Sequence, residues 1–278
     1  MFRIIHLFSN SYSVSSLCKY FNVSKSGYYE HLRLDNNRDI EILEQIKEVQ
    51  RKCRQTYGYR RVQIALKRQE HCYNHKKVLR VMRRYNLLSK VRRKSMYIRN
   101  KDITHRYANL YNQNFSTTRV NEKWVTDVSY IITKEGRLFL SVIRDIHDGL
   151  VIAYKYSTIQ DMKLVSDTIK LALSNTKVNK TILHSDQGFQ YTSQMYNKLL
   201  LANGITPSMS RKATPLDNAP AESFFSMLKT ECIYIEKPKT IEEAKGLIDE
   251  YIDFYNYERI QLKHRCSPNE QRQKSLSG

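Results

Sequence analysis

The sequence contains few of the features that mark membrane, secreted or disulfide-rich proteins. No apolar run approaches the about 20 residues that a membrane-spanning helix needs, and the mean hydropathy is −0.61. The N-terminus has a short apolar stretch but no small-residue cleavage site, so we expect no secretion signal. The five cysteines are scattered and odd in number, which argues against a disulfide framework. We therefore expect a cytoplasmic protein that has no membrane partner.

Acidic residues are also scarce. The 278 residues include 27 Asp and Glu against 47 Lys and Arg, which gives a formal net charge of +20. An excess of this size favours a polyanion as partner, most simply a nucleic acid. Hydrophobic residues make up 41% of the chain, enough for a packed core, so wholesale disorder is not expected.

The positive charge is concentrated in one segment. Residues 47–106 hold 20 Lys and Arg against 3 Asp and Glu, a net charge of +17, whereas residues 1–46 are neutral and residues 107–278 carry +3. This partition predicts a short N-terminal helical segment (1–46), a basic helical region that binds DNA (47–106) and a near-neutral C-terminal domain (107–278). The polar, aperiodic stretch 100–119 is the expected connection.

The N-terminal segment has the outline of a helix-turn-helix. Val14, Leu17 and Cys18 have helical spacing, Asn22 is placed at a turn, and Ser24 can cap a second short helix. Short helical hairpins are common, so this outline alone does not identify a DNA-binding motif.

Helical spacing predicts further helices in and beside the basic segment. Apolar residues recur with this spacing in 40–49, 62–66 and 78–85, and Asn74 can cap the last of these helices. Their remaining faces are basic, which suits a DNA groove or backbone, and an ordinary solvated bundle is the alternative. The candidate DNA-binding residues here are Arg60, Arg61, Lys76, Lys77, Arg80, Arg83 and Arg84.

The C-terminal domain has a different periodicity. Strands are predicted at 124–132, 138–146, 150–157, 180–186 and 205–210, and helices at 161–173, 193–202, 221–232 and 241–257. Three strands in a meander followed by alternating helices and strands predict an α/β fold: a mixed five-stranded sheet with flanking helices, preceded by an all-helical region.

Three acids stand out by their positions in these elements. Asp127 lies inside the first strand, Asp186 ends the fourth, and Glu222 begins a helix. If the first and fourth strands are parallel neighbours, both aspartates meet at one edge of the sheet and Glu222 can reach over them. Grouped carboxylates repel one another, and a divalent cation is the usual compensation. An oxygen-rich site of this kind suits Mg²⁺, and two ions about 3.5–4 Å apart can clamp a phosphodiester.

Spacing alone is weak evidence, because acids occupy 27 of 278 positions. The sequence motifs around the three acids are more specific. They are WVTDVSYI, HSDQGFQYTS and DNAPAESFFSMLKTE, with 35 residues between Asp186 and Glu222. VSKSGYY, YGYRR and VLRVM precede them, and YIDFYNYERIQ and Ser267-Pro268 follow. In combination these motifs resemble the OrfB-type transposases of bacterial insertion sequences, which belong to the retroviral-integrase-like D-D-E superfamily. The resemblance covers nearly the whole chain.

The resemblance implies an RNase H-like core in which Asp127, Asp186 and Glu222 are the catalytic, metal-binding triad. Lys229 matches the family's basic position seven residues after the glutamate, about two helical turns on, and could hold a phosphate; a solvated lysine is the alternative. His184 shares a strand face with Asp186, and either supports the site or is simply packed. Asp217 and Asn218 belong to the family's DNA-side loop and are the better candidates for site support.

Two positions depart from the family's pattern. The chain has Ala213-Thr214 where a Gly-Asn pair is usual, and Ser129 where threonine is commoner. Neither change removes a carboxylate, although the first alters the loop before Glu222.

The expected function is metal-dependent DNA strand transfer. Activated water would cut a phosphodiester at the element terminus, and the exposed 3′-hydroxyl would attack a second phosphodiester, with Mg²⁺ or Mn²⁺ as cofactor and two ions present when DNA is bound. The alternatives are a structure-selective RNase H-like nuclease, which cleaves without joining, and a catalytically inactive DNA-binding regulator.

The resemblance also implies partners and a location. These are double-stranded DNA, as terminal inverted repeats and as target, further copies of the chain in a homo-oligomer on DNA, and an upstream helix-turn-helix frame joined by frameshifting. A bacterial cytoplasmic, nucleoid-associated location follows.

Overall fold

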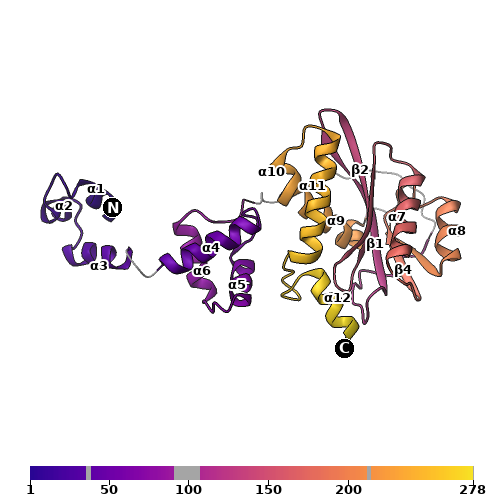
Figure 1. Ribbon diagram of the computed structural model, residues 1–278, viewed down its shortest axis with the longest axis horizontal. Coiled ribbons are helices and arrows are strands. Elements are labelled where there is room, and N and C mark those ends of the chain that lie inside the picture. The colour runs from indigo at the N-terminus through magenta and orange to yellow at the C-terminus, as the bar shows by residue number, and fades with distance from the viewer. Residues whose placement is uncertain (36–38, 91–106, 212–213, 278) are drawn as a thin grey trace. The chain divides into compact units, whose positions relative to one another are not determined.

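The computed structural model describes residues 1–35, 39–90, 107–211 and 214–277 (Figure 1). The chain forms two compact units, residues 1–89 and 90–278. Within the described ranges, no helix combines the length and apolar character that crossing a bilayer demands.

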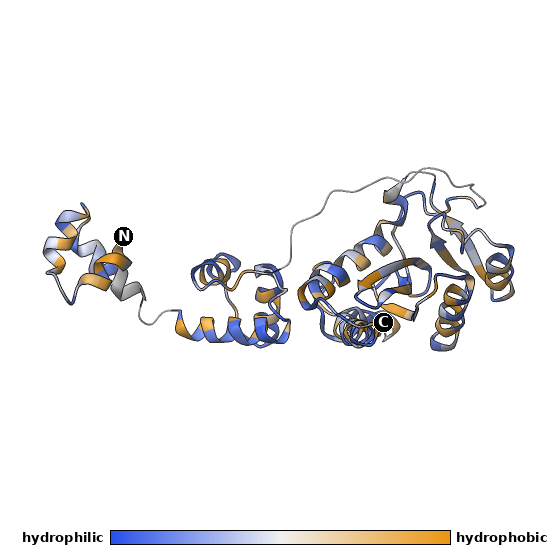
Figure 2. Cartoon of the chain, turned by 90° about the horizontal axis from the view of Figure 1, so that it is seen from above, coloured by the Kyte–Doolittle hydropathy of each residue, from blue (hydrophilic) through white to orange (hydrophobic). Residues whose placement is uncertain are grey.

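The regular secondary structure of the first unit, in its described residues, consists of helices. Its helices are α1 (Phe2–Phe8), α2 (Val14–Tyr20), α3 (Lys25–Asp35), α4 (Ile40–Lys52), α5 (Tyr59–Arg68) and α6 (His75–Arg84). The predicted caps are present, because Ser24 Oγ accepts from the Gly27 amide at 3.0 Å and Asn74 Oδ1 accepts from the Lys76 amide at 2.8 Å. In Figure 2 apolar and hydrophilic residues alternate around these helices, as expected for helices that bury only one face.

The helices do not end where the charge changes. The step in net charge at residues 46–47 falls inside α4, whose first turn contains Glu41 and whose last turn contains Arg51 and Lys52. The three-part division by charge therefore remains a proposal about which residues meet DNA. It does not mark the end of a structural element.

The second unit contains the predicted mixed five-stranded sheet. Its strands are β1 (Lys123–Thr133), β2 (Gly136–Asp145), β3 (Val151–Ser157), β4 (Thr181–Ser185) and β5 (Ile205–Met209). Their order is β3-β2-β1-β4-β5, with antiparallel pairing in the β1–β3 meander and parallel pairing of β4 with both β1 and β5. The expected parallel neighbourhood of the first and fourth strands is thus confirmed.

Helices cover both faces of the sheet (Figure 1). They are α7 (Met162–Asn175), α8 (Gln194–Ala202), α9 (Ala219–Leu228), α10 (Tyr234–Glu236), α11 (Ile241–Asp253) and α12 (Pro268–Ser277), with a 3₁₀ turn η1 (Pro215–Asn218) and two π-helical segments, η2 (Lys229–Ile233) and η3 (Phe254–Glu258). α7 and α8 pack over Trp124 and Ile143 on one face, and α9 and α11 pack over Ile131 and Leu138 on the other.

One expectation about helices and one about a connection need correction. The two long helices predicted at 221–232 and 241–257 each change to π geometry in their last turns, at η2 and η3. Residues 107–119, expected to be part of a plain connection, pack onto the sheet, as shown by Tyr111, which is 1% exposed. Residues 100–106 of that expected connection lie outside the described residues.

Candidate active site

The strand register brings Asp127 and Asp186 to adjacent positions. Val125 of β1 pairs with His184 of β4, and Asp127 and Asp186 each follow their strand's paired residue by two positions. Because side chains alternate along a strand, both aspartates point to the same face as Val125, which packs with Ala221 of α9. The two carboxylates therefore lie side by side beneath α9.

Glu222 completes the group from the first turn of α9. The charge of Asp186 raises the pKa of Glu222, after the larger effect of burial. Burial likewise raises the pKa of Asp127 well above its usual range, and the charges of Asp186 and Glu222 raise it further. Asp127 and Glu222 are thus close enough to other acids of the group for their ionised forms to be destabilised by neighbouring negative charge.

Each aspartate is oriented by one backbone hydrogen bond in its own segment. Asp127 Oδ1 accepts from the Val128 amide at 2.8 Å, and Asp186 Oδ1 accepts from the Gly188 amide at 2.9 Å. Both bonds lower the pKa of their carboxyl group, although burial outweighs them. Each carboxylate is therefore fixed in direction, and burial still makes its ionised form costly.

Lys229 is a basic side chain whose positive charge acts on Asp127. It begins η2, donates from Nζ to Ser129 Oγ at 2.7 Å, and lies 5.4 Å from the centre of the Tyr130 ring. Its charge lowers the pKa of Asp127, and burial lowers its own pKa. The serine that departs from the family's threonine is thus the partner of this lysine.

The donor set fits a hard divalent cation, because it consists of carboxylates that repel one another. Within the described part of the chain, however, no three His, Cys, Asp or Glu side chains are gathered closely enough to hold a metal ion. The structure therefore brings Asp127, Asp186 and Glu222 near one another without closing them into a coordination shell.

Comparisons with known proteins agree with this architecture. The integrase core domain family matches residues 117–215, a second integrase core domain family matches residues 222–276, and an HTH-like domain family matches residues 37–95. The putative transposase InsK for insertion sequence element IS150 of Escherichia coli is 34% identical over 264 residues, which cover 94% of this chain and 93% of that protein. Transposase InsF for insertion sequence IS3A of the same organism is 30% identical, and the match covers 96% of this chain and 96% of that protein. This chain belongs to the IS3-family transposases.

Solved structures that are similar to this chain include the HTLV-2 integrase catalytic core domain in complex with magnesium. It is 15% identical to this IS3-family chain, with a TM-score of 0.47, and the match covers 55% of this chain and 97% of that one.

His184, a predicted support residue, is buried in a polar pocket of this transposase. Its Nδ1 lies 2.8 Å from Ser208 Oγ, its Nε2 lies 3.0 Å from Ser210 Oγ, and its ring stacks on Tyr111 with centroids 4.5 Å apart. Burial lowers the pKa of His184 to about 4, so the ring is neutral at physiological pH. It links β4 to β5, two residues before Asp186 in the chain.

Asp217 and Asn218 hold the segment that leads into α9. Asp217 is fully buried and forms an ion pair with Arg211 at 3.0 Å, and the hydrogen bonds it accepts from Arg211 and Gln113 lower its pKa to about 2, against the opposing effect of burial. Asn218 is buried and its Nδ2 is 3.5 Å from the carbonyl oxygen of Thr126, the neighbour of Asp127. Neither residue is one of the three predicted acids. Both hold the backbone around these acids.

The candidate DNA-binding residues of the helical unit differ in how they are engaged. Arg80 makes a bidentate contact with the buried Asp39 at 2.8 and 2.9 Å, and Arg84 is 3.7 Å from the same carboxylate. These two arginines tie α6 to the start of α4. The cations of Arg60, Arg61 and Lys77 lie over tyrosine rings, at 5.7, 5.8 and 5.0 Å from the ring centres. Lys76 and Arg83 are exposed.

Sequence reasoning missed several residues around the site. Gly188 supplies the amide that orients Asp186, and Asn109, Tyr111 and Gln113 reach the site region from the stretch before β1. The only signal for Gly188 was its place two residues after an aspartate that ends a strand. Asn109 donates to Asp217, which is 108 residues away along the chain, so no local pattern reveals that contact.

Proposed function

We propose that the chain cuts and joins DNA at the ends of an insertion sequence, with Asp127, Asp186 and Glu222 holding two Mg²⁺ or Mn²⁺ ions. The observation that supports this most directly is the closeness of the three carboxylates: burial raises the pKa of each, and neighbouring negative charge raises the pKa of Asp127 and of Glu222 further. Such a group is costly unless cations compensate it.

The chain's residues have distinct tasks in this proposal. Asp127 and Asp186 present carboxylates whose directions are set by the Val128 and Gly188 amides. Bound divalent ions would lower the pKa of the attacking water or 3′-hydroxyl and neutralise charge on the phosphate. Lys229, held by Ser129, adds a positive charge next to Asp127 where a DNA phosphate would lie.

The same proposal assigns DNA affinity to the helical unit. Its exposed basic residues would bind the element's terminal inverted repeats, and the catalytic unit would receive target DNA. Because cutting and joining act on two element ends, the working assembly is proposed to be a homo-oligomer on DNA.

The test replaces Asp186 by asparagine, which keeps its shape and removes its charge. With a duplex that carries an element end, Mg²⁺-dependent nicking and joining should both fall on the order of 10³-fold, since metal-ion stabilisation is worth several kcal/mol. Asp167→Asn on the surface of α7 removes the same charge from a residue paired with Lys163, and should leave both activities intact.

The outcomes separate the proposal from its alternatives. A folded D186N variant that retains activity would overturn the triad. A wild-type chain that nicks but never joins would be a structure-selective nuclease. A chain that binds the duplex and neither nicks nor joins with Mg²⁺ or Mn²⁺ would be a DNA-binding regulator.

A further inference from the structure

The segment before β1 contacts the starts of β1 and β4 and the end of β5. The Met209 amide at the end of β5 donates to the Ala108 carbonyl at 3.3 Å, and the Leu110 amide donates to Ser208 Oγ at 3.0 Å. Ser208 is also the partner of His184. Residues 107–115, here called the strap, are therefore joined through Ser208 to His184.

Tyr111 anchors the strap. Its hydroxyl lies 2.7 Å from the Trp124 carbonyl oxygen and 2.9 Å from the Ile182 carbonyl oxygen, which belong to the two strands that carry or precede the aspartates. Its ring stacks on His184 with an interplanar angle of 15°. A side chain held at both its ring and its hydroxyl gives the strap a fixed place on the sheet.

From this anchored strap, Asn109 and Gln113 reach Asp217. Asn109 Nδ2 donates to Asp217 Oδ2 at 2.7 Å, and Gln113 Nε2 donates to Asp217 Oδ1 at 3.2 Å. Asn109 Oδ1 accepts from the amides of Tyr111 and Asn112 at 3.1 and 2.9 Å. These two bonds fix which end of the amide faces Asp217, so an aspartate at 109 could not replace the asparagine.

Asp217 is also held by Arg211, six residues before it in the chain. It accepts from the Arg211 amide at 2.8 Å and from the Arg211 guanidinium at 3.0 and 3.1 Å, which holds the two ends of the connection between β5 and η1 together. Glu222 follows five residues later in the first turn of α9. The buried Asp217 thus has donors on two sides, Arg211 from its own loop and the strap from the other.

We propose that Asn109 is a positioning residue for Glu222, acting through Asp217 to set where the third carboxylate stands relative to Asp127 and Asp186. This inference rests on the proposed function, in which the three carboxylates bind metal together. Loss of a partner bonded directly to a metal ligand typically costs about 10- to 100-fold in metal affinity. Asn109 acts through Asp217, so we expect the low end of that range. The effect should therefore appear in metal binding before any DNA is added.

The experiment compares Asn109→Ala with Asn179→Ala, a matched change at an exposed asparagine of the same unit. Mn²⁺ binding to the DNA-free chain is measured by electron paramagnetic resonance, and exchange of the Arg211 amide by hydrogen exchange. N109A should weaken Mn²⁺ binding about tenfold and accelerate Arg211 exchange, while N179A changes neither. Strand transfer by N109A should recover largely at saturating Mn²⁺, whereas a merely structural defect would not.

A second variant keeps the inference open to refutation if N109A does not fold. Gln113→Ala removes the longer of the two bonds to Asp217 and should shift both readouts in the same direction by a smaller factor. Unchanged Mn²⁺ affinity and unchanged Arg211 exchange in a folded variant would overturn the inference. If the wild-type chain binds no Mn²⁺, the proposed function fails, and Arg211 exchange still reports whether Asn109 positions the loop.

Discussion

At the scale of single residues, the tightest approach near the carboxylates is at Gly188. A methyl group at this position would lie 3.0 Å from Asp186 Oδ1, 2.9 Å from Gln190 Oε1 and 3.3 Å from the Tyr191 ring. The Gln190 end is flexible but almost completely buried. The carboxylate of Asp186 would therefore have to move, together with the amide that orients it.

Gly188→Ala is predicted to damage both stability and activity. Overpacking should cost about 1–3 kcal/mol in the free energy of unfolding, measured by urea denaturation. Displacement of Asp186 should lower strand transfer on the order of 10²-fold. Gly246→Ala in α11 is the matched control, since its added methyl meets nothing within 4 Å, and alanine should stabilise that helix by roughly 0.5–1 kcal/mol. A G188A chain as active as G246A would contradict the prediction.

The neighbouring strand positions of Asp127 and Asp186 could be predicted from the sequence, and the surroundings of the proposed site could not. Asp127 and Asp186 sit at strand positions that alternation and parallel pairing place on one face, and the structure has this register. Asn109 and Tyr111 depend on contacts far along the chain, which only the folded sheet brings together. Their polar, aperiodic surroundings gave the appearance of a plain connection.

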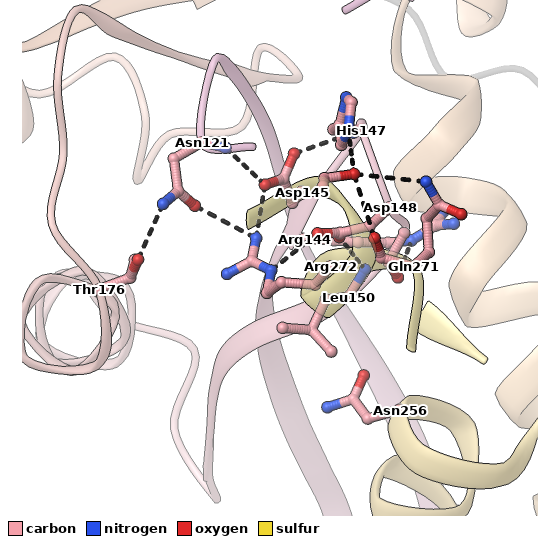
Figure 3. A network of polar contacts seen from close by, with 12 residues as sticks. Asn121, Arg144, Asp145, His147, Asp148, Leu150, Thr176, Asn256, Gln271 and Arg272 are labelled. Carbon is pink, nitrogen blue, oxygen red and sulfur yellow. Dashed lines mark hydrogen bonds and ion pairs between the residues drawn. The ribbon is translucent and has the colours of Figure 1, made fainter. Parts of the chain in front are cut away.

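At the scale of elements, the helices reveal why periodicity succeeded in some places and failed in others. α7 was predicted because apolar residues repeat at helical spacing in 161–173, and α8 was predicted at 193–202. In the structure Asp161 and Ser193 cap these two helices. α12 has no such apolar face, and it was not predicted. What holds it is polar: Arg272 donates to Asp148 Oδ2 at 2.7 Å and to Asp145 Oδ2 at 2.6 Å (Figure 3).

The π segments have a similar explanation. The apolar pattern of 221–232 and 241–257 indicated two continuous helices, and nothing in the pattern marks a wider turn. In the structure η2 places Glu231, and η3 leads directly into Arg259, so that the buried pair meets at 2.6 Å. Tyr251 adds its hydroxyl to the same carboxylate at 2.9 Å. The apolar pattern within one helix cannot predict the Glu231–Arg259 ion pair, because its two residues come from different helical segments.

Arg272→Ala is predicted to release α12 and to do so in a pH-dependent way. Burial and the charge of Asp148 raise the pKa of Asp145 from 3.8 to about 6 in the folded chain. A raised folded pKa means that stability present at low pH is lost as pH rises through about 6. Without the guanidinium the pKa should rise further. The loss in unfolding free energy should thus be larger at pH 8, about 3–5 kcal/mol, than at pH 5.

Urea denaturation at the two pH values checks this. Lys274→Ala, an exposed residue on the same helix, serves as the matched control and should cost little at either pH. An equal loss at pH 5 and pH 8 for R272A would show that Arg272 acts through packing rather than by compensating two buried carboxylates.

At the scale of the whole molecule, DNA affinity and chemistry are proposed to reside in different parts of the chain. Residues 47–106 carry a net charge of +17, whereas the near-neutral part from 107 onward holds the three acids. The charge pattern predicted this division. It did not predict the start of the helical bundle, because α4 begins with acidic residues and the HTH-like match starts at residue 37.

The double variant Lys76→Ala/Arg83→Ala is predicted to change the salt dependence of DNA binding. Both residues are exposed on α6, whereas Arg80 of the same helix is engaged by Asp39. Each lost phosphate contact lowers the slope of log affinity against log salt by about 0.9, so the slope should fall by about 2. The measurement is fluorescence anisotropy of an element-end duplex between 50 and 200 mM salt.

The complementary half of this prediction concerns metal removal. A chelator should abolish nicking and joining while leaving the salt slope of binding unchanged, because the proposed metal ligands lie outside the basic segment. Lys163→Ala/Lys170→Ala removes two lysines that pair with Asp167 on α7 and should leave the slope unaltered. If that control lowers the slope as much as the α6 variant, the DNA must also lie along α7. If chelation lowers the slope as well, the catalytic unit contributes to affinity, and the separation of binding from chemistry would be wrong.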